Sequence, residues 1–347
     1  MDKVTVIGMD LGDKNHKAVG LAADGTEIER AEVSNTPDEV QEFLTRHPGA
    51  LLAVETGTHC RWISRLAVGM GHEVLVGNAR KLRMIWNSSR KNDWNDAEML
   101  AKLARADRSL LVPVKLRDDE SQELLRLVKA RDILVKHRAG IVNMIRGFCK
   151  AEGGRMDGCT TEAFVRQEFD VPKVLREATK PLFAVLRELS KKVALFDKIL
   201  VQSLEKKHRE AAASVMAING VGPVTAAAFI ATVGNPATFG KPRDAGAYLG
   251  LVPRQDQSGQ SDRQLRITKE GNTQVRALLV NCANYIMGPF GKDCDLRRHG
   301  LRIAARGGKN ARKRAKVAVA RKLAVVMLAL LQSKKEYCPL MGDAYMA

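Results

Sequence analysis

The sequence has no long apolar run and no recognisable export signal, and both absences exclude whole classes of protein. The longest uninterrupted apolar run, 323–331, has nine residues, whereas a membrane helix needs about 20. The N-terminus has a strand-like pattern and lacks the small-residue cleavage site of a secretory signal. We therefore expect a soluble protein that stays inside the cell.

Clustered cysteines are also missing. A zinc site needs neighbouring ligands, and the sequence contains no Cys-x-x-Cys pair. With 347 residues, of which 45% are hydrophobic, the chain can bury a core without disulfides. We expect reduced thiols at all six positions: Cys60, Cys149, Cys159, Cys282, Cys294 and Cys338.

Acidic residues are scarce in one part of the chain, so the net charge of +18 is unevenly distributed. Residues 1–110 carry 15 Lys and Arg against 16 Asp and Glu, whereas residues 111–347 carry 42 against 23. A basic excess confined to one part predicts binding of a polyanion, with nucleic acid the first choice. An anionic membrane surface is the less favoured alternative, because no basic amphipathic anchor is visible.

Strand and helix patterns alternate through the first 110 residues. The sequence Thr36-Pro37-Asp38-Glu39 has a capping residue, a first-position proline and first-turn acids, which predict a helix start. The full order is β-β-β-α-β-α-β-α, with strands expected at 4–9, 17–22, 27–34, 51–54 and 73–76 and further helices near 61–69 and over 93–105. Residues 1–115 are therefore expected to form an α/β domain, a mixed sheet covered by helices.

The rest of the chain is mainly helical in pattern. Two long segments with helical apolar spacing within 116–210 are separated by the Gly-rich break 152–154. We expect an antiparallel helical pair that serves as a dimerisation element or spacer; a plain helical core is the alternative. Residues 211–347 are basic and rich in small residues, which predicts an all-α domain.

Four acidic residues fall where strands end or helices begin. Asp10 and Glu55 each follow an apolar strand, where a charge is costly without a purpose. Asp93 and Asp96 lie three residues apart at a predicted helix start, so they share one face. Four converging carboxylates repel one another unless a cation neutralises them, and Mg²⁺ prefers such oxygen ligands. The alternative for Asp93 is an ordinary helix cap or a solvated acid.

Three segments have the composition of phosphate-binding elements. The sequence Ile218–Thr225 resembles the turn of a helix-hairpin-helix, in which Gly220 and Gly222 let the backbone approach a phosphate and Thr225 lies at the next helix start. Ser258 precedes a glycine in a polar loop and is a candidate nucleophile, with an ordinary turn serine as the alternative. The cations around this serine are Arg254, Arg263, Arg266, Lys269 and Arg276.

The third segment, 300–322, contains nine Lys or Arg and no acid. A nucleic-acid contact surface is favoured over a merely solvated helix face, and neutralising six phosphates would give a log-log salt slope of about −5. The segment lacks aromatics, which argues against base stacking as the main mode of binding. Its candidate contact residues are Arg306, Lys309, Arg312, Lys313 and Arg314.

Taken together in order, these motifs resemble the DEDD-type transposases of bacterial insertion sequences. The resemblance spans nearly the whole chain and is carried by MDLG, ETGTH, NDWND, NGVGPVTA and GLVPRQDQSG…RITKEGN. It implies a RuvC-like domain with the RNase H fold, a coiled-coil segment, and a helical domain at 211–347 that carries the serine. It also implies that Asp10, Glu55, Asp93 and Asp96 bind Mg²⁺, in a two-metal or shared-metal site, and that Ser258 is the nucleophile. Ser261, three residues later, is the alternative.

The same resemblance implies the partners. Similar proteins act on donor and target DNA under the guidance of a structured non-coding RNA, a bridge RNA, encoded by the element. It further implies a homo-oligomer, dimer or tetramer, in the bacterial cytoplasm at the nucleoid.

Three functions follow from these features. The favoured one is a DNA recombinase that passes through a covalent serine–DNA intermediate. The second is a metal-dependent, structure-selective nuclease that uses the four carboxylates and water, without a covalent intermediate. The third is a nucleic-acid-binding scaffold without enzymatic activity, in which the acids are structural.

Overall fold

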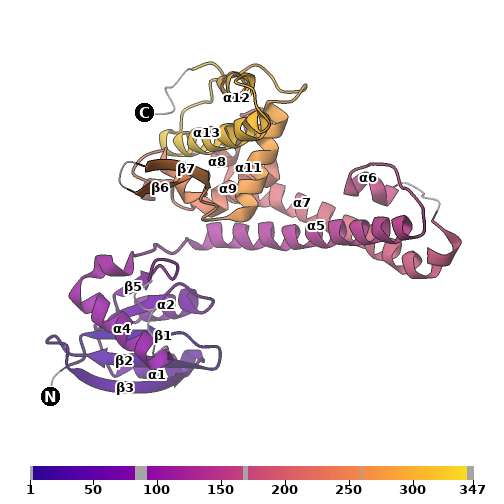
Figure 1. The fold of residues 1–347 in the computed structure, drawn as a ribbon. Coiled ribbons are helices and arrows are strands. Elements are labelled where there is room, and N and C mark those ends of the chain that lie inside the picture. The colour runs from indigo at the N-terminus through magenta and orange to yellow at the C-terminus, as the bar shows by residue number, and fades with distance from the viewer. Residues whose placement is uncertain (1–2, 83–91, 167–170, 259–260, 342–347) are drawn as a thin grey trace. The chain divides into compact units, whose positions relative to one another are not determined.

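The computed structural model describes residues 3–82, 92–166, 171–258 and 261–341, and for 256–258 and 261–264 it describes the backbone alone. The chain forms two compact units, Met1–Leu116 and Arg117–Ala347 (Figure 1).

The first unit is built on a five-stranded mixed sheet with the strand order β3-β2-β1-β4-β5. β1, β2 and β3 are antiparallel, whereas β1, β4 and β5 run parallel. The strands are β1 (Val6–Asp10), β2 (Asn15–Leu21), β3 (Glu27–Ser34), β4 (Leu51–Glu55) and β5 (Val74–Gly77). The predicted mixed α/β arrangement is therefore confirmed, and it is consistent with an RNase H-like domain.

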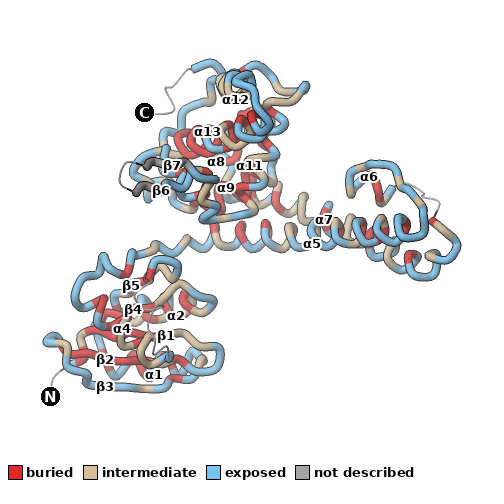
Figure 2. The backbone as a smooth tube through the Cα atoms, viewed as in Figure 1, coloured by how far each residue is buried: buried red, intermediate tan, exposed pale blue. Residues whose placement is uncertain are grey.

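Helices cover both faces of this sheet because its central strands alternate between two apolar cores. Ile7 and Met9 of β1 pack on the side of α1 (Pro37–Thr45) and α2 (Cys60–Gly69). Val6 packs in the other core, with α4 (Asp93–Ala106) and the short 3-10 helix Arg108–Leu111. Figure 2 shows the buried residues concentrated in the strands and on the inner sides of the helices.

A glycine allows α4 to lie directly against the central strand. A Cβ atom at Gly8 would lie 2.1 Å from the carbonyl oxygen of Ala97 and 2.4 Å from the amide nitrogen of Ala101. Real Cβ atoms do not approach backbone so closely, so only glycine fits here. The helix that begins at Asp93 is therefore held against β1 by backbone contact.

The second unit contains two long helices, α5 (Asp119–Ala151) and α7 (Arg176–Lys207), which lie side by side (Figure 1). They are antiparallel, because residues early in α5 contact residues late in α7. The side-chain pairs that show this are Glu123–Lys207, Arg131–Asp197 and Arg138–Ser190. Between them come α6 (Thr161–Arg166) and a 3-10 turn (Lys173–Leu175). The far end has a core of its own, in which Phe164 stacks on Phe183 with 5.8 Å between ring centroids.

The remaining helices are α8 (Arg209–Met216), α9 (Pro223–Val233), α10 (Asp244–Tyr248), α11 (Thr273–Ile286), α12 (Asp295–Ala305) and α13 (Ala311–Ser333), with a 3-10 turn at Pro236–Thr238. They pack on two central ones: α5, α7, α8 and α11 contact α9, whereas α10, α11 and α12 contact α13. In α9, nine consecutive residues, 225–233, are buried. Within the described residues, no helix is both long and apolar enough to cross a bilayer.

One element differs from the sequence expectation. The segment around Ser258, expected to be a polar loop in an all-α domain, forms an antiparallel hairpin of β6 (Pro253–Ser258) and β7 (Ser261–Ile267). The sequence of the hairpin is almost entirely polar, so it lacks the alternation of apolar and polar residues by which strands are recognised. The backbone pairing of β6 with β7, rather than a pattern of apolar side chains, defines this hairpin.

Candidate functional site

Asp10 and Glu55 lie side by side at one edge of the sheet. β1 and β4 are parallel with Met9 opposite Val54, so the next pair in register is Asp10 and Glu55, at the last residue of each strand. Side chains alternate between faces along a strand, and Val6 lies in the α4-side core. Both carboxylates therefore belong to the face that α4 covers.

The start of α4 lies at this same edge, as two contacts show. Trp94, in its first turn, lies under the ammonium group of Lys17, 4.9 Å from the ring centre, and Lys17 is the register partner of Asp10. Near the helix end, Arg105 donates to the carbonyl of Ala23 at 3.2 Å, in the turn after β2. Helix α4 therefore runs antiparallel to β1, and its first turn faces the carboxyl ends of β1 and β4.

This placement brings Asp93 and Asp96 to the edge that carries the other two acids. Asp93 is not the helix cap: the cap is Asn92, whose side chain accepts a hydrogen bond from the amide of Asn95 at 2.8 Å. Asp93 is exposed in the first turn, and Asp96 is half-buried one turn further on. The capping explanation for Asp93 is therefore wrong.

The four acids share an edge but do not form a closed ligand set. Within the described part of the chain, no three His, Cys, Asp or Glu side chains are arranged to hold a metal ion. Asp10, Glu55 and Asp96 each interact with other groups. An all-carboxylate donor set suits a hard cation such as Mg²⁺, and without one, mutual repulsion opposes closer approach.

The opposite face at this end of the sheet carries two histidines. His16 precedes Lys17 in β2, so it points to the α2 side, where its ring lies 6.2 Å from that of His59 and 6.4 Å from that of Trp62. It is fully buried, and neither ring nitrogen has a hydrogen-bond partner among the described residues. Burial and then the nearby His59 lower the pKa of His16. His16 is therefore on the side of the sheet opposite the four acids, and His59 pairs with the Asp13 carboxylate at 3.1 Å.

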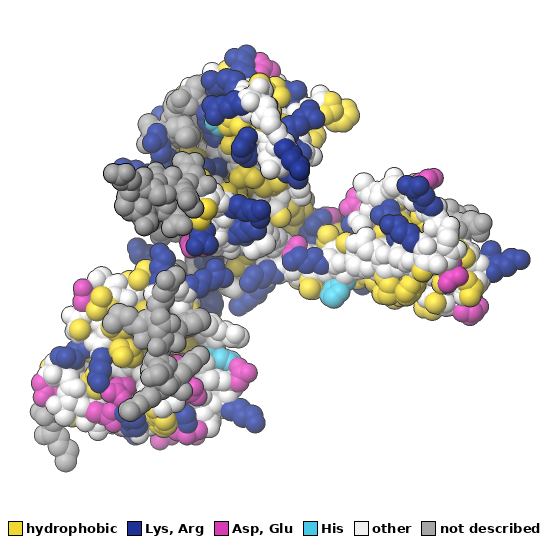
Figure 3. All heavy atoms as spheres, viewed as in Figure 1, with side chains coloured by type: hydrophobic (Ala, Val, Ile, Leu, Met, Phe, Trp, Pro, Cys, Tyr) yellow, Lys and Arg dark blue, Asp and Glu magenta, His cyan; other side chains and the backbone are white. Residues whose placement is uncertain are grey.

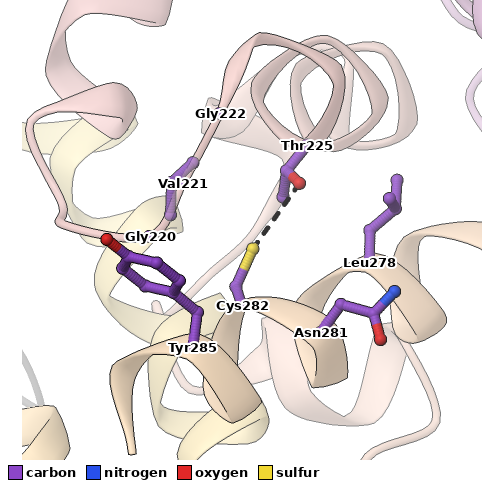
Figure 4. A pocket seen from close by; sticks show the side chains of 8 residues that line it. All are labelled: Gly220, Val221, Gly222, Thr225, Leu278, Asn281, Cys282 and Tyr285. Carbon is purple, nitrogen blue, oxygen red and sulfur yellow. Dashed lines mark hydrogen bonds between the residues drawn. The ribbon is translucent and has the colours of Figure 1, made fainter. Parts of the chain in front are cut away.

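The turn between α8 and α9 lies against α11 and lines an open pocket of about 440 Å³ (Figure 4). Gly220 has a φ of +96°, and a Cβ there would lie 2.9 Å from the Tyr285 ring, so glycine is required. Gly222 caps α9, is exposed, and has open space around the position of a Cβ. Thr225 was expected to contact a phosphate, but it is buried with its hydroxyl 3.5 Å from the Cys282 sulfur.

Arg276 also differs from its expected role. It is buried beneath the base of the hairpin, where its guanidinium donates to the carbonyls of Leu249 (2.9 Å) and Glu270 (2.7 Å) and to the Thr273 hydroxyl (3.1 Å). Leu249 precedes β6 and Glu270 follows β7, so one side chain joins both ends of the hairpin. Burial lowers the pKa of this guanidinium. Arg276 therefore fixes the hairpin and is not presented to a phosphate.

The hairpin holds the two candidate serines at its tip. Ser258 ends β6, Ser261 begins β7, and the two are register partners. Their side chains, like that of Arg263, lie outside the described residues. Of the cations predicted beside them, Arg254 is exposed on β6, whereas Arg266 and Lys269 line a large cavity.

This cavity, of about 1430 Å³, lies in the second unit between β7, α10, α12 and α13. Of the cations predicted in 300–322, Lys313 and Arg314 line it, and Arg306, Lys309 and Arg312 are exposed elsewhere. Of the other four cations that line it, Arg302, Arg321 and Lys322 lie in the predicted segment 300–322 without having been named as contact residues, and Arg243 was missed. Spacing offered a signal for Arg321, which lies seven residues, about two helical turns, after Arg314 on the same helix face. Figure 3 shows Lys and Arg side chains over much of the visible surface of this unit.

Comparison with known proteins finds similarity to transposases in both units. Residues 7–151 match the model of a DEDD transposase of IS110 elements, described as "Transposase", and residues 212–292 match the "Transposase IS116/IS110/IS902 family". The chain is 30% identical to a Sinorhizobium fredii protein, y4pF/y4sB, whose name assigns it as a transposase, over 99% of this chain and 88% of that protein. It is 28% identical to the transposase for insertion sequence element IS1111A of Coxiella burnetii, over 97% of this chain and 92% of that one. The transposase for IS1328 of Yersinia enterocolitica is 27% identical, over 83% of this chain and 85% of that protein.

Proposed function

Because the chain belongs to the IS116/IS110/IS902 family of DEDD-type insertion-sequence transposases, we propose that it cuts and rejoins DNA through a covalent bond to Ser258. The observation that carries the proposal is the sheet edge of the first unit. The strand register and the direction of α4 bring Asp10, Glu55 and the α4 acids to this edge, although they are up to 86 residues apart in sequence. A fold has no structural need to concentrate like charges in this way.

The four carboxylates are proposed to hold Mg²⁺. When bound, the ion neutralises charge on the transferring phosphoryl group and on the leaving oxygen. Asp10 and Glu55, at the ends of neighbouring strands, would hold the ion. Asp93 and Asp96, on the first turn of α4, would supply further oxygen ligands.

The covalent step is proposed to take place at the tip of the hairpin. The Ser258 oxygen forms a bond to the DNA phosphorus while the bond from phosphorus to the leaving deoxyribose oxygen breaks. The serine proton is transferred to a base and a proton is returned to the leaving oxygen, so charge balances. A hydroxyl of a second strand then attacks the phosphoserine, rejoins the DNA and frees the serine. The bond energy is conserved, and no nucleotide cofactor is consumed.

The basic second unit is proposed to hold the nucleic acids. Exposed cations of β6 and 300–322 supply contacts to the backbone, and the Gly222 end of α9 supplies free amide groups for a phosphate. We propose that an element-encoded bridge RNA pairs with donor and target DNA and so selects the sites. The protein would then read backbone and A-form shape rather than bases.

A homo-oligomer, dimer or tetramer, completes the proposal. Residues 116–210 are proposed as the oligomerisation segment, and 211–347 as the domain that carries the nucleophile. Large apolar side chains remain exposed along α5, where Ile133 is 50%, Met144 43% and Phe148 38% exposed. An exposed apolar stripe on a long helix is a typical surface for a second copy of the chain.

A plasmid recombination assay with the guide RNA supplied tests the proposal. Ser258→Ala is expected to abolish formation of the joined product. Ser261→Ala, a change at the register partner of Ser258, is expected to leave product formation unchanged. Asp10→Asn and Glu55→Gln are each expected to lower product formation at least 100-fold. Metal-dependent strand cutting that survives in Ser258→Ala would instead identify a nuclease that uses water. Joined product at the parent level in all four variants would refute the roles assigned to the serine and the carboxylates, whereas a scaffold without enzymatic activity would form no joined product even as the parent protein.

A further inference from the structure

Helix α13 presents one basic face to the large cavity described above. Four cations of this helix line the cavity, Lys313, Arg314, Arg321 and Lys322. Arg314 and Arg321 are seven residues apart and therefore align over two helical turns, and Lys313 and Lys322 lie to either side of them. The opposite stripe, which includes Val319 and Leu323, is buried in the core of the unit. The helix is therefore rigidly anchored on one side while it presents charge on the other.

Three other segments add cations to the same cavity. Arg243 directly precedes α10, and Arg302 lies in α12. Arg266 lies near the end of β7, and Lys269 lies in the loop that follows it. Eight Lys or Arg side chains therefore line one cavity, and the described residues of its lining include no Asp or Glu. Such a concentration of charge is stable only if an anionic partner or solvent ions offset it.

Two glycines bring these segments close together. A Cβ at Gly300 in α12 would lie 2.6 Å from a methyl of Val319, so α12 packs on α13 at glycine contact. A Cβ at Gly246 in α10 would lie 3.1 Å from Cγ of Arg321. The aliphatic part of the Arg321 side chain therefore packs against α10 at a position that has no side chain. The charged wall therefore has a fixed shape.

The floor and length of the cavity indicate what it holds. Its uncharged lining is mostly aliphatic, with Leu251, Ile267, Val317 and Val325, and it also includes Asn310 and the imidazole of His299. The lining contains no Phe, Tyr or Trp and eight cations against one imidazole ring, so the chemistry fits sugar and phosphate better than a stack of bases. The α13 lining runs from Lys313 to Val325, about 18 Å at 1.5 Å per residue. That length matches about five nucleotides of one strand at about 3.4 Å each.

The cavity also has a fixed relation to the proposed nucleophile. Pro253, the first residue of β6, lines the cavity, and Ser258 is five residues further along the same strand. An extended strand spans about 17 Å over that distance, again about five nucleotides of one strand.

We propose that this cavity binds the sugar–phosphate backbone of the DNA strand that is cut, within about five nucleotides of the bond that Ser258 attacks. The proposal rests on the proposed function for the identity of that strand. Binding is independent of base sequence, and a single strand lies along the cavity, which is partly open to solvent. Arg302 and Arg321, on facing helices, clamp the backbone from two sides.

The test measures binding of a mixed-sequence single-stranded DNA of about 20 nucleotides over a series of salt concentrations. The protein is the full chain carrying Ser258→Ala, so no cutting contributes and the outcome does not depend on the nucleophile. Adding Arg302→Ala and Arg321→Ala is expected to lower affinity at least tenfold at low salt. It is also expected to reduce the log-log salt slope by about 1.4, at about 0.7 for each lost phosphate contact on a single strand.

The matched control removes the same charge from α7. Lys191→Ala with Lys192→Ala changes two exposed cations that pair with Glu188 and lie outside the cavity, so its slope should equal that of the parent. Equal slopes for all three proteins would overturn the proposal. A loss confined to an RNA of the same sequence, with DNA binding unchanged, would overturn the assignment to the cut strand. Ethylation interference with serine-intact protein then maps the phosphates, which should lie within about five nucleotides of the cut.

Discussion

At the scale of single residues, the sequence identifies charged residues that follow apolar strands. It does not identify charged residues whose hydrogen bonds are made to the protein's own backbone. Asp10 and Glu55 could be recognised because each ends a buried strand. In the structure the two strands are parallel neighbours, so both residues lie at the same edge of the sheet. Arg276 could not be read correctly, because its partners are carbonyl groups at Leu249 and Glu270. Every residue has a backbone carbonyl, so the sequence does not show which carbonyls accept a hydrogen bond from an arginine. A buried structural arginine therefore cannot be distinguished from a phosphate-binding one by residue type.

The role of Arg276 predicts a loss of stability when the residue is replaced. Arg276→Met should lower the free energy of unfolding by about 1–3 kcal/mol, since the carbonyls lose their donors. It should also open the hairpin to protease and lower recombination, and because the end of β7 lines the cavity, single-stranded DNA affinity should fall, but by less than the tenfold expected for Arg302→Ala with Arg321→Ala. Arg254→Met, at an exposed position of β6, should leave unfolding unchanged. Urea unfolding and limited proteolysis measure this, and equal protease resistance of both variants would refute the role.

His16 predicts a pH dependence of stability. Burial lowers its pKa in the folded state, whereas the unfolded chain titrates near about 6.5. Between these two values only the unfolded chain takes up the proton, so folding stability is complete above about pH 6.5 and falls as the pH is lowered. Urea midpoints at pH 7.5 and 5.5 should therefore differ less in His16→Leu than in the parent. His137→Gln, at an exposed position, should retain the parent difference; an unchanged difference in His16→Leu would exclude His16 as its source.

At the scale of elements, apolar periodicity predicted the first unit well. Its strands and helices lie within one or two residues of their expected bounds, since each buries an apolar face that the sequence displays. The β6–β7 hairpin was missed for the opposite reason. Its residues are polar, and it is held by backbone geometry, in which a Cβ at Gly250 would lie 2.3 Å from the backbone nitrogen of Glu270.

The packing of α4 on β1 predicts the effect of one methyl group. Gly8→Ala should push the helix from the sheet, lower the free energy of unfolding by about 1–3 kcal/mol and displace Asp93 and Asp96 from the edge, with loss of recombination. Gly69→Ala, where the added Cβ meets no atom within 4 Å, is the control and should leave both properties near those of the parent. Thermal unfolding and the plasmid assay measure them, and a fully active Gly8→Ala protein would contradict the packing argument.

At the scale of the whole molecule, the charge distribution along the sequence predicted which part of the chain concentrates cations. The neutral part of the sequence forms a unit with an acidic sheet edge, and the basic part forms a helical unit with a cavity lined by cations. The cavity itself could not be predicted. Its walls come from Arg243, the hairpin, α12 and α13, and only the folded chain shows that these segments meet.

The central claim, a covalent serine–DNA intermediate, is tested most directly by trapping and sequencing the adduct. End-labelled DNA is incubated with protein, guide RNA and Mg²⁺, denatured, and digested with trypsin, and the DNA-linked peptide is identified by mass spectrometry. We expect one adduct, linked through the hydroxyl of Ser258, that Ser258→Ala abolishes and Ser261→Ala does not. An adduct on Ser261, or cut DNA with free ends and no attached peptide, would contradict the account.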